Sequence, residues 1–220
     1  YHRWEDVLPG VDIDRWASQD AIDELILRYI RGYGPVTNSD IEWWTGFTKA
    51  RCQAAVETMQ DEIEEVAVDG WPGPLYRLPD QEAPVEERSD VKVLPLLDPY
   101  VQGYRDRDRL VESERFDFVW DGGGNATATL LLHGQIIGVW QPVDKPTKQL
   151  RYHLFTGGPP SIRRNAEAAL AAASRLYFDE IVDLVCVDEM KPLSAEGGRS
   201  AAHPLDSQLH RASRRRDPDN

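Results

Sequence analysis

Three groups of residues in this sequence combine cationic side chains with hydroxyl or amide donors, the chemical groups that bind phosphate oxygens. They are Thr48, Lys49 and Arg51; Arg105, Arg107 and Arg109; and Lys145, Lys148, Arg151, Arg163 and Arg164. The third group lies between residues 141 and 164, where these five cations face Asp144 alone, a local surplus of four. We predict that all three groups contact nucleic-acid phosphates. The alternatives are a solvated helix start for the first group and surface pairing with neighbouring aspartates for the second.

The charge of the whole chain opposes this prediction. Its 220 residues carry 38 Asp and Glu against 25 Lys and Arg, a formal net charge of −13. Such a balance disfavours a polyanionic partner. It fits a protein from a high-salt or high-GC source as well as it fits an acidic protein that binds other proteins. The distribution of the cations, and not their number, must therefore decide whether nucleic acid binds.

The sequence gives little indication of a metal site, a nucleotide-binding loop or a catalytic centre. The two cysteines, Cys52 and Cys186, lie far apart, and the five histidines lack the spacing of metal ligands. Gly122 to Gly124 is not followed by the Lys and Ser of a phosphate-binding loop. We therefore predict no metal, no small-molecule cofactor and no catalytic residue within these residues. No apolar run reaches the roughly 20 residues of a membrane span, so we expect no membrane partner and a reduced, cytoplasmic protein.

The elements that must position the first cationic group follow a helix-turn-helix pattern. We expect a helix capped by Ser18, a break at Gly34-Pro35, a short helix capped by Asn38 or Ser39, and a third helix capped by Thr48. Two strands, near residues 63–68 and 75–78, then predict an acidic wing. Residues 18–79 are thus predicted to form a winged helix. Its two adjacent tryptophans, Trp43 and Trp44, are expected in the core in preference to a base-stacking role.

A second αβ body is predicted for residues 92–191. Strands are expected near residues 93–97, 127–132, 136–140 and 149–155, paired as an antiparallel sheet with a hairpin turn at His133-Gly134. A long helix from Pro160 should bury a stripe that runs from Ile162 to Leu176 and Tyr177. The fold class is therefore α+β. Residues 1–17 are interpreted as a connection from an upstream domain, 80–91 as an acidic linker and 192–220 as a disordered tail.

Several of these segments occur in an order that resembles a known family. They are Tyr33 to Thr37, Trp43 to Gly46, Leu94 to Tyr100, Gly103 to Arg107, and Gly124 to Trp140. Over roughly residues 1–185 the chain is similar to the bacterial winged-helix DNA-binding proteins that include the AlkZ/YcaQ-type DNA glycosylases. The resemblance implies tandem winged helices around duplex DNA and, in a complete protein, metal-free hydrolysis of the N-glycosidic bond at alkylated bases or interstrand crosslinks.

The family's catalytic signature does not occur in this sequence. The resemblance implies a Gln-x-Gln or Gln-x-Asp motif in an N-terminal winged helix, and neither pattern is present among the 220 residues. We therefore expect the C-terminal, DNA-binding part of such a protein, joined to an upstream winged helix and associated with the nucleoid. By itself it should bind duplex DNA weakly and excise no base. Charge reversal at Lys145, Lys148 and Arg151 should weaken binding more than reversal at Arg211 to Arg216. The alternatives are a non-enzymatic winged-helix transcription regulator and a protein-interaction module that uses the acidic wing.

Overall fold

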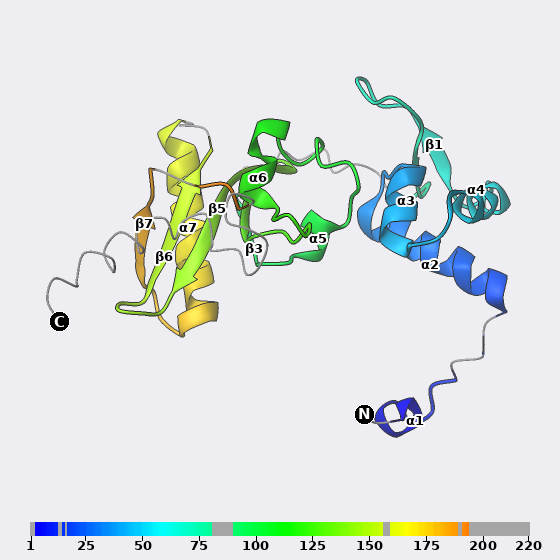
Figure 1. The fold of residues 1–220 in the computed structure, drawn as a ribbon, viewed down its shortest axis with the longest axis horizontal. Coiled ribbons are helices and arrows are strands. Elements are labelled where there is room, and N and C mark those ends of the chain that lie inside the picture. Colours follow the sequence, from blue (N-terminus) through cyan, green and yellow to red (C-terminus); the bar gives the residue numbers. More distant parts are fainter. Residues whose placement is uncertain are drawn as a thin grey trace, which may run out of the picture. The chain divides into compact units, whose positions relative to one another are not determined.

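The computed structural model describes residues 3–12, 15, 17–80, 90–155, 159–188 and 191–193. The chain forms two compact units (Figure 1). The first contains Tyr1–Ala83 together with Gly103–Arg105, and the second contains Pro84–Gln102 and Asp106–Asn220. Most of the predicted linker and tail, and part of the predicted N-terminal connection, lie outside the described residues. The architecture is mixed α and β, with two separate sheets.

The first unit consists of helices followed by a short β-ribbon. The helices are α1 (Trp4–Val7), α2 (Ser18–Tyr33), α3 (Asn38–Thr45) and α4 (Lys49–Thr58), and the strands are β1 (Glu64–Val66) and β2 (Leu75–Arg77). β1 and β2 pair antiparallel, and Val36 forms an additional bridge to Tyr76 of β2. Buried aliphatic side chains of α2 and α3, among them Ile26, Ile30 and Ile41, fill the centre of this unit.

The helix boundaries of the first unit confirm some of the predicted caps and correct others. Gly46 ends α3 in the left-handed conformation, and Thr48 caps α4, as predicted. The cap of α3, however, is Thr37, one residue before the predicted Asn38 or Ser39, because Thr37 and Asp40 form a reciprocal capping box. Ser18 is the first residue of α2 and not its cap; Ala17 occupies that position without a side-chain hydrogen bond.

The second unit is built on a five-stranded sheet in the order β3-β4-β5-β6-β7. Its strands are β3 (Lys92–Leu94), β4 (Thr129–Leu132), β5 (Gln135–Val143), β6 (Gln149–Leu154) and β7 (Asp183–Cys186). The short helices α5 (Pro99–Gln102), η1 (Ser113–Arg115) and α6 (Phe116–Val119) precede β4, and α7 (Pro160–Phe178) joins β6 to β7. The His133-Gly134 turn is confirmed, with both residues at positive φ.

Two expectations for this unit were wrong. The sheet is not wholly antiparallel, because β7 pairs parallel to β6 after the crossover through α7. The buried stripe of α7 also ends earlier than predicted: Ala166, Leu170 and Ala173 are buried, whereas Leu176 is 86% exposed and Tyr177 is 46% exposed. In the last turn of α7 Leu176 faces solvent, whereas Phe178 packs against the buried cluster and Tyr177 contacts the Trp140 ring edge-on at 5.1 Å.

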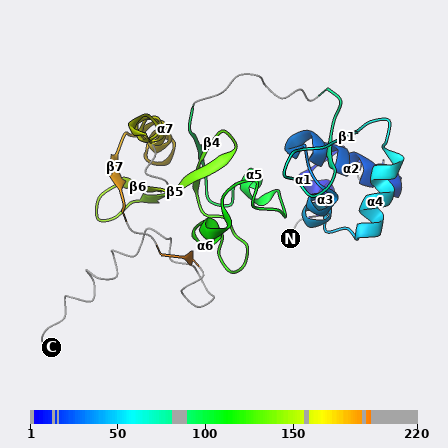
Figure 2. The same ribbon diagram turned by 90° about the horizontal axis from the view of Figure 1, so that it is seen from above.

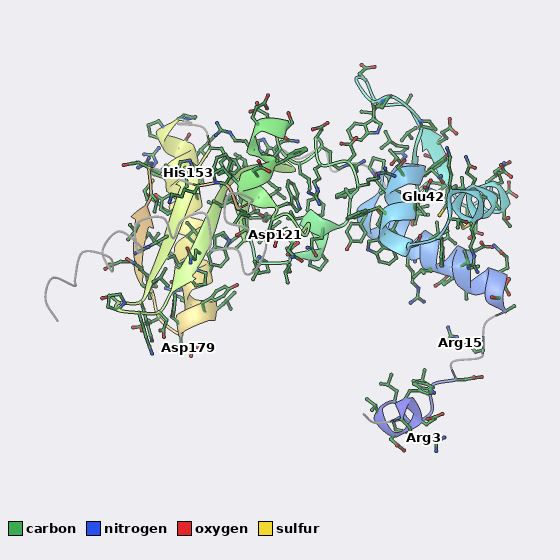
Figure 3. The ribbon with its side chains drawn as sticks, viewed as in Figure 1. Arg3, Arg15, Glu42, Asp121, His153 and Asp179 are labelled. Carbon is green, nitrogen blue, oxygen red and sulfur yellow. The ribbon has the colours of Figure 1, made fainter. Side chains whose placement is uncertain are left out.

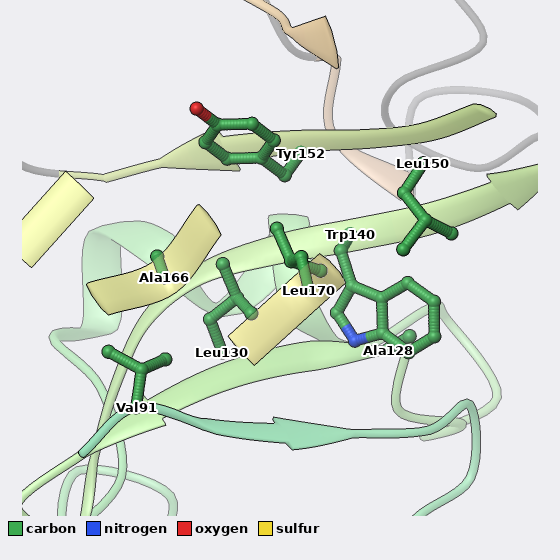
Figure 4. Close-up of a cluster of buried hydrophobic side chains, with 8 residues drawn as sticks. All are labelled: Val91, Ala128, Leu130, Trp140, Leu150, Tyr152, Ala166 and Leu170. Atoms are coloured by element: carbon green, nitrogen blue, oxygen red, sulfur yellow. The ribbon is translucent and has the colours of Figure 1, made fainter. Parts of the chain in front are cut away.

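The core of the second unit lies between α7 and one face of the sheet. Figure 2 shows α7 nearly end-on, on one side of β6 and β7. The buried cluster, drawn in Figure 4, consists of Val91, Ala128, Leu130, Trp140, Leu150, Tyr152, Ala166 and Leu170. The Trp140 indole nitrogen donates to the Leu94 carbonyl at 2.9 Å, and the Tyr152 hydroxyl donates to Glu167 at 2.5 Å. Burial and this hydrogen bond raise the pKa of Tyr152, so its hydroxyl stays protonated.

Candidate nucleic-acid interface

The first predicted cationic group lies at the start of α4. The Thr48 hydroxyl accepts from the Arg51 backbone amide at 3.4 Å, which satisfies one of the free amides of the helix. Lys49 and Arg51 are exposed, and the Arg51 guanidinium lies 4.7 Å from the centre of the Phe47 ring. Contact with the Phe47 ring restricts the movement of the Arg51 side chain, and the outer edge of the guanidinium stays accessible. The helix N-terminus and two accessible cations thus present positive potential together.

Arg105 belongs to the same unit, although it is far from α4 in the sequence. Its backbone amide donates to Asp40 Oδ1 at 2.9 Å, and Asp40 is fully buried in the first turn of α3. Asp40 Oδ2 also accepts from the amide and hydroxyl of Thr37, at 3.0 and 2.9 Å. Next to Arg105, the Tyr104 hydroxyl donates to the Tyr33 carbonyl at 2.9 Å. The segment Gly103–Arg105 is therefore held firmly, and it leaves the Arg105 side chain exposed beside α3.

Arg105 and Lys49 lie near opposite ends of α3. An eight-residue helix is about 12 Å long, so the two cationic positions flank one short element of the first unit. Neither residue takes part in a side-chain ion pair within the described part of the chain.

Arg107 and Arg109, predicted together with Arg105, belong to the second unit and are partly buried. The Arg107 guanidinium lies 4.6 Å from the centre of the Trp120 ring. Gly124, at φ +83°, leaves room for Arg107: a Cβ there would lie 3.3 Å from an Arg107 nitrogen. Burial lowers the pKa of Arg107, and the nearby Asp121 carboxylate opposes that shift. Because Arg107 packs on Trp120 and Gly124, its side chain has a structural role in the segment that contains these two residues.

The third predicted group does not form a single patch. Lys145 and Lys148 lie at the β5–β6 turn, whereas Arg163 and Arg164 lie in the first turns of α7. The turn is close to the opposite end of α7, because Lys148 Nζ lies 2.9 Å from Glu180 and 5.9 Å from the Phe178 ring. Nineteen helical residues span about 28 Å. Figure 3 labels Asp179, which follows the last residue of α7, and His153, which lies in β6.

The two halves of this group also differ in their electrostatics. The hydrogen bond to Glu180 raises the pKa of Lys148, and the charges of Glu180, Asp144 and Asp179 act in the same direction. These carboxylates largely offset the positive charge at the turn. Arg163 and Arg164 are exposed and make no ion pair with another described residue. Arg151 lies on the sheet, in β6, and is partly buried.

Sequence reasoning missed Arg115, a partly buried cation that contacts Phe155 just after the end of β6. Arg115 donates to the Phe155 carbonyl at 3.3 Å, and its guanidinium lies 5.5 Å from the Phe155 ring. His153 contacts the same ring and hydrogen-bonds the Val187 carbonyl through Nδ1 at 2.6 Å. No local pattern pointed to Arg115, since its partners lie 40 residues further along the chain.

Sequence reasoning also misjudged Trp43 and Trp44, which were expected in the core. Their exposed fractions are 51% and 39%. The inward-facing positions of α3 are taken by Asp40 and Ile41, each fully buried, and an eight-residue helix offers few others. The tryptophans therefore lie at the surface, immediately before the turn that leads to α4.

No metal centre or membrane segment is seen among the described residues. Within those ranges, no three His, Cys, Asp or Glu side chains gather closely enough to hold a metal ion. In the same part of the chain, no helix is both long and apolar enough to cross a membrane.

Comparisons with known proteins point to one family. The sequence profile of a family described as "DNA glycosylase AlkZ-like" matches residues 1–177. Among solved structures, the DNA glycosylase AlkZ of Streptomyces sahachiroi is similar to this chain, with a TM-score of 0.64 and 22% sequence identity. The similarity covers 77% of this chain and 46% of AlkZ, so the chain spans less than half of that protein. No curated protein sequence matches the chain.

Proposed function

Since the chain belongs to the AlkZ-like DNA glycosylase family, we propose that it forms the DNA-holding part of a glycosylase that acts on alkylated bases or interstrand crosslinks. The observation that carries this proposal is a pair of accessible cationic positions that flank α3 on the first unit: Lys49 with Arg51 on one side, and Arg105 on the other. The partner is double-stranded DNA, recognised mainly through its backbone.

The first unit is proposed to act as a winged helix, with residues 18–79 as its extent. Three helices followed by the antiparallel ribbon β1–β2, with Val36 bridging to β2, support this assignment. In that arrangement α4 is the recognition helix, and its N-terminal residues meet the DNA. The ribbon carries Glu64 and Glu65, and we propose that it lies away from the phosphates. The second unit, residues 92–191, adds Arg163 and Arg164 as further contacts.

Catalysis is proposed to need residues other than these 220. They contain no Gln-x-Gln or Gln-x-Asp motif, the signature implied by the family resemblance. An upstream winged helix of the same protein would supply it. The proposal assigns binding and orientation of the duplex to this part of the protein, and removal of the base to the other.

Charge reversal tests the proposed interface. The Lys49→Glu/Arg51→Glu double variant should weaken binding of a labelled duplex by about tenfold or more in low salt, because two phosphate contacts become repulsive. Fluorescence anisotropy measures the change. The matched control is Lys145→Glu/Lys148→Glu, which should cost less than about threefold because carboxylates already offset Lys148. A larger loss for the control pair would move the DNA contact to the β5–β6 turn.

A further inference from the structure

Two adjacent tryptophans on the first unit have no role in the interface described so far. Trp43 and Trp44 lie in the last turn of α3, with exposed fractions of 51% and 39%. Burying an indole is strongly favourable, so two neighbouring ones left at the surface indicate a contact with another molecule.

The Trp44 ring is fixed before any partner arrives. It stacks on Tyr29 with 4.8 Å between ring centres and 24° between planes, and Tyr29 stacks in turn on Tyr33 at 4.9 Å and 28°. Tyr29 is 1% exposed, and its hydroxyl donates to the Gly103 carbonyl at 2.7 Å. Trp44 also contacts Tyr33, with 6.2 Å between ring centres and 50° between planes, so the three rings form a compact cluster. A flat partner that stacked on the accessible part of Trp44 would therefore meet a ring that is already held in place, with little loss of side-chain freedom.

The charges on either side of Trp44 suit a nucleic acid. One helical turn before Trp44, Asp40 holds the backbone of Arg105. After α3 ends at Thr45, the exposed Lys49 and Arg51 lie in the first turn of α4. At 3.6 residues per turn Glu42 lies about 160° around α3 from Trp44, and it accepts a hydrogen bond from Asn38 at 3.0 Å. Along the chain Trp44 thus lies between the turn that holds Arg105 and the two cations of α4, and Glu42, the acidic side chain of α3 that is not buried, lies on the other side of the helix.

We propose that Trp44, with Trp43 beside it, is a stacking site for an unpaired nucleobase, whose flanking phosphates Arg105 and Lys49 hold. This inference rests on the proposed DNA-binding function and adds the feature of DNA that is recognised. Both faces of a base are covered inside an intact duplex. A free face becomes available to an indole only where pairing is interrupted by a gap, a bulge or a distorting lesion.

A pair of otherwise identical duplexes tests the site. One carries a single bulged 2-aminopurine and the other carries the same base paired. The chain should bind the bulged duplex roughly fivefold more tightly or better, the effect expected for one base stacked on an aromatic ring, with quenching of 2-aminopurine fluorescence. Trp44→Ala should abolish the preference and the quenching while leaving affinity for the paired duplex within about twofold. Trp44→Phe should restore part of the preference, because it keeps an aromatic ring.

Controls separate stacking from loss of structure. Trp71→Ala removes a tryptophan from the β1–β2 loop of the same unit and should keep the preference in full. Circular dichroism of Trp44→Ala and Trp44→Phe checks the fold; if Trp44→Ala unfolds, Trp43→Ala and Trp44→Phe carry the comparison, and both should reduce the preference.

Each outcome has one meaning. Equal binding of the two duplexes by the unaltered chain, or a preference that survives in the tryptophan variants, overturns the stacking site and leaves duplex binding intact. In that case the tryptophans would serve a protein partner instead. Failure to bind either duplex overturns the proposed function and this inference together.

Discussion

Replacing Asp40 by alanine is expected to lower the free energy of unfolding of the first unit by about 4 kcal/mol. The carboxylate is fully buried and accepts hydrogen bonds from the Thr37 amide, the Thr37 hydroxyl and the Arg105 amide. Alanine would leave at least two backbone amides without these acceptors, and each such loss costs about 1–3 kcal/mol in a buried site. Urea unfolding followed by circular dichroism measures the change.

The same substitution, Asp40→Ala, should also weaken DNA binding, because it changes the position of Arg105. Without Asp40, the segment Gly103–Arg105 loses its hydrogen bond to α3, so Arg105 is no longer held beside that helix. Asp40→Asn keeps a carbonyl acceptor and should cost less than Asp40→Ala. The matched control is Asp20→Ala, which removes an exposed carboxylate from the first turn of α2 and should change stability by less than about 1 kcal/mol. A loss below about 1 kcal/mol for Asp40→Ala would contradict this role.

Gly138→Ala is expected to destabilise the second unit by about 3 kcal/mol. Gly138 lies in β5 opposite Leu154 of β6, and a Cβ there would meet the His153 carbonyl oxygen at 2.2 Å. The obstructing atoms belong to the backbone of β6, so no side chain can rotate away. The central pairing of the sheet would have to separate, which thermal unfolding should detect as a lower melting temperature.

Gly122→Ala provides a control in the same unit, since a Cβ at Gly122 would meet nothing within 4 Å. Its stability should stay within about 0.5 kcal/mol of that of the unaltered chain. Equal stability of Gly138→Ala and Gly122→Ala would mean that β5 and β6 do not approach as closely as described.

Local chemistry was enough to predict many of the elements. Thr48 and Gly46 fixed the turn between α3 and α4, because a side-chain cap and a left-handed glycine act within a few residues. The His133-Gly134 turn and the start of α7 at Pro160 were found for the same reason. Each of these features depends on neighbours in the sequence and needs no knowledge of the tertiary structure.

Features that depend on distant contacts were missed. The parallel strand β7 has only four residues, and its pairing with β6 requires the whole of α7 as a crossover. The cations of residues 141–164, expected as one patch, lie apart because β6, about 20 Å long at 3.3 Å per residue, separates the β5–β6 turn from the start of α7. Trp43 and Trp44 were assigned to the core by their size, although the inward positions of α3 were already filled by Asp40 and Ile41.

The dependence of duplex binding on salt tests the central claim most directly. If Lys49, Arg51 and Arg105 each neutralise a phosphate, these three contacts should make the logarithm of affinity fall with the logarithm of salt at a slope of about −2.7. Binding would then weaken roughly 40-fold between 50 and 200 mM salt. An affinity that does not change over this range, or no binding at 50 mM salt, would contradict the assignment of this chain to holding DNA.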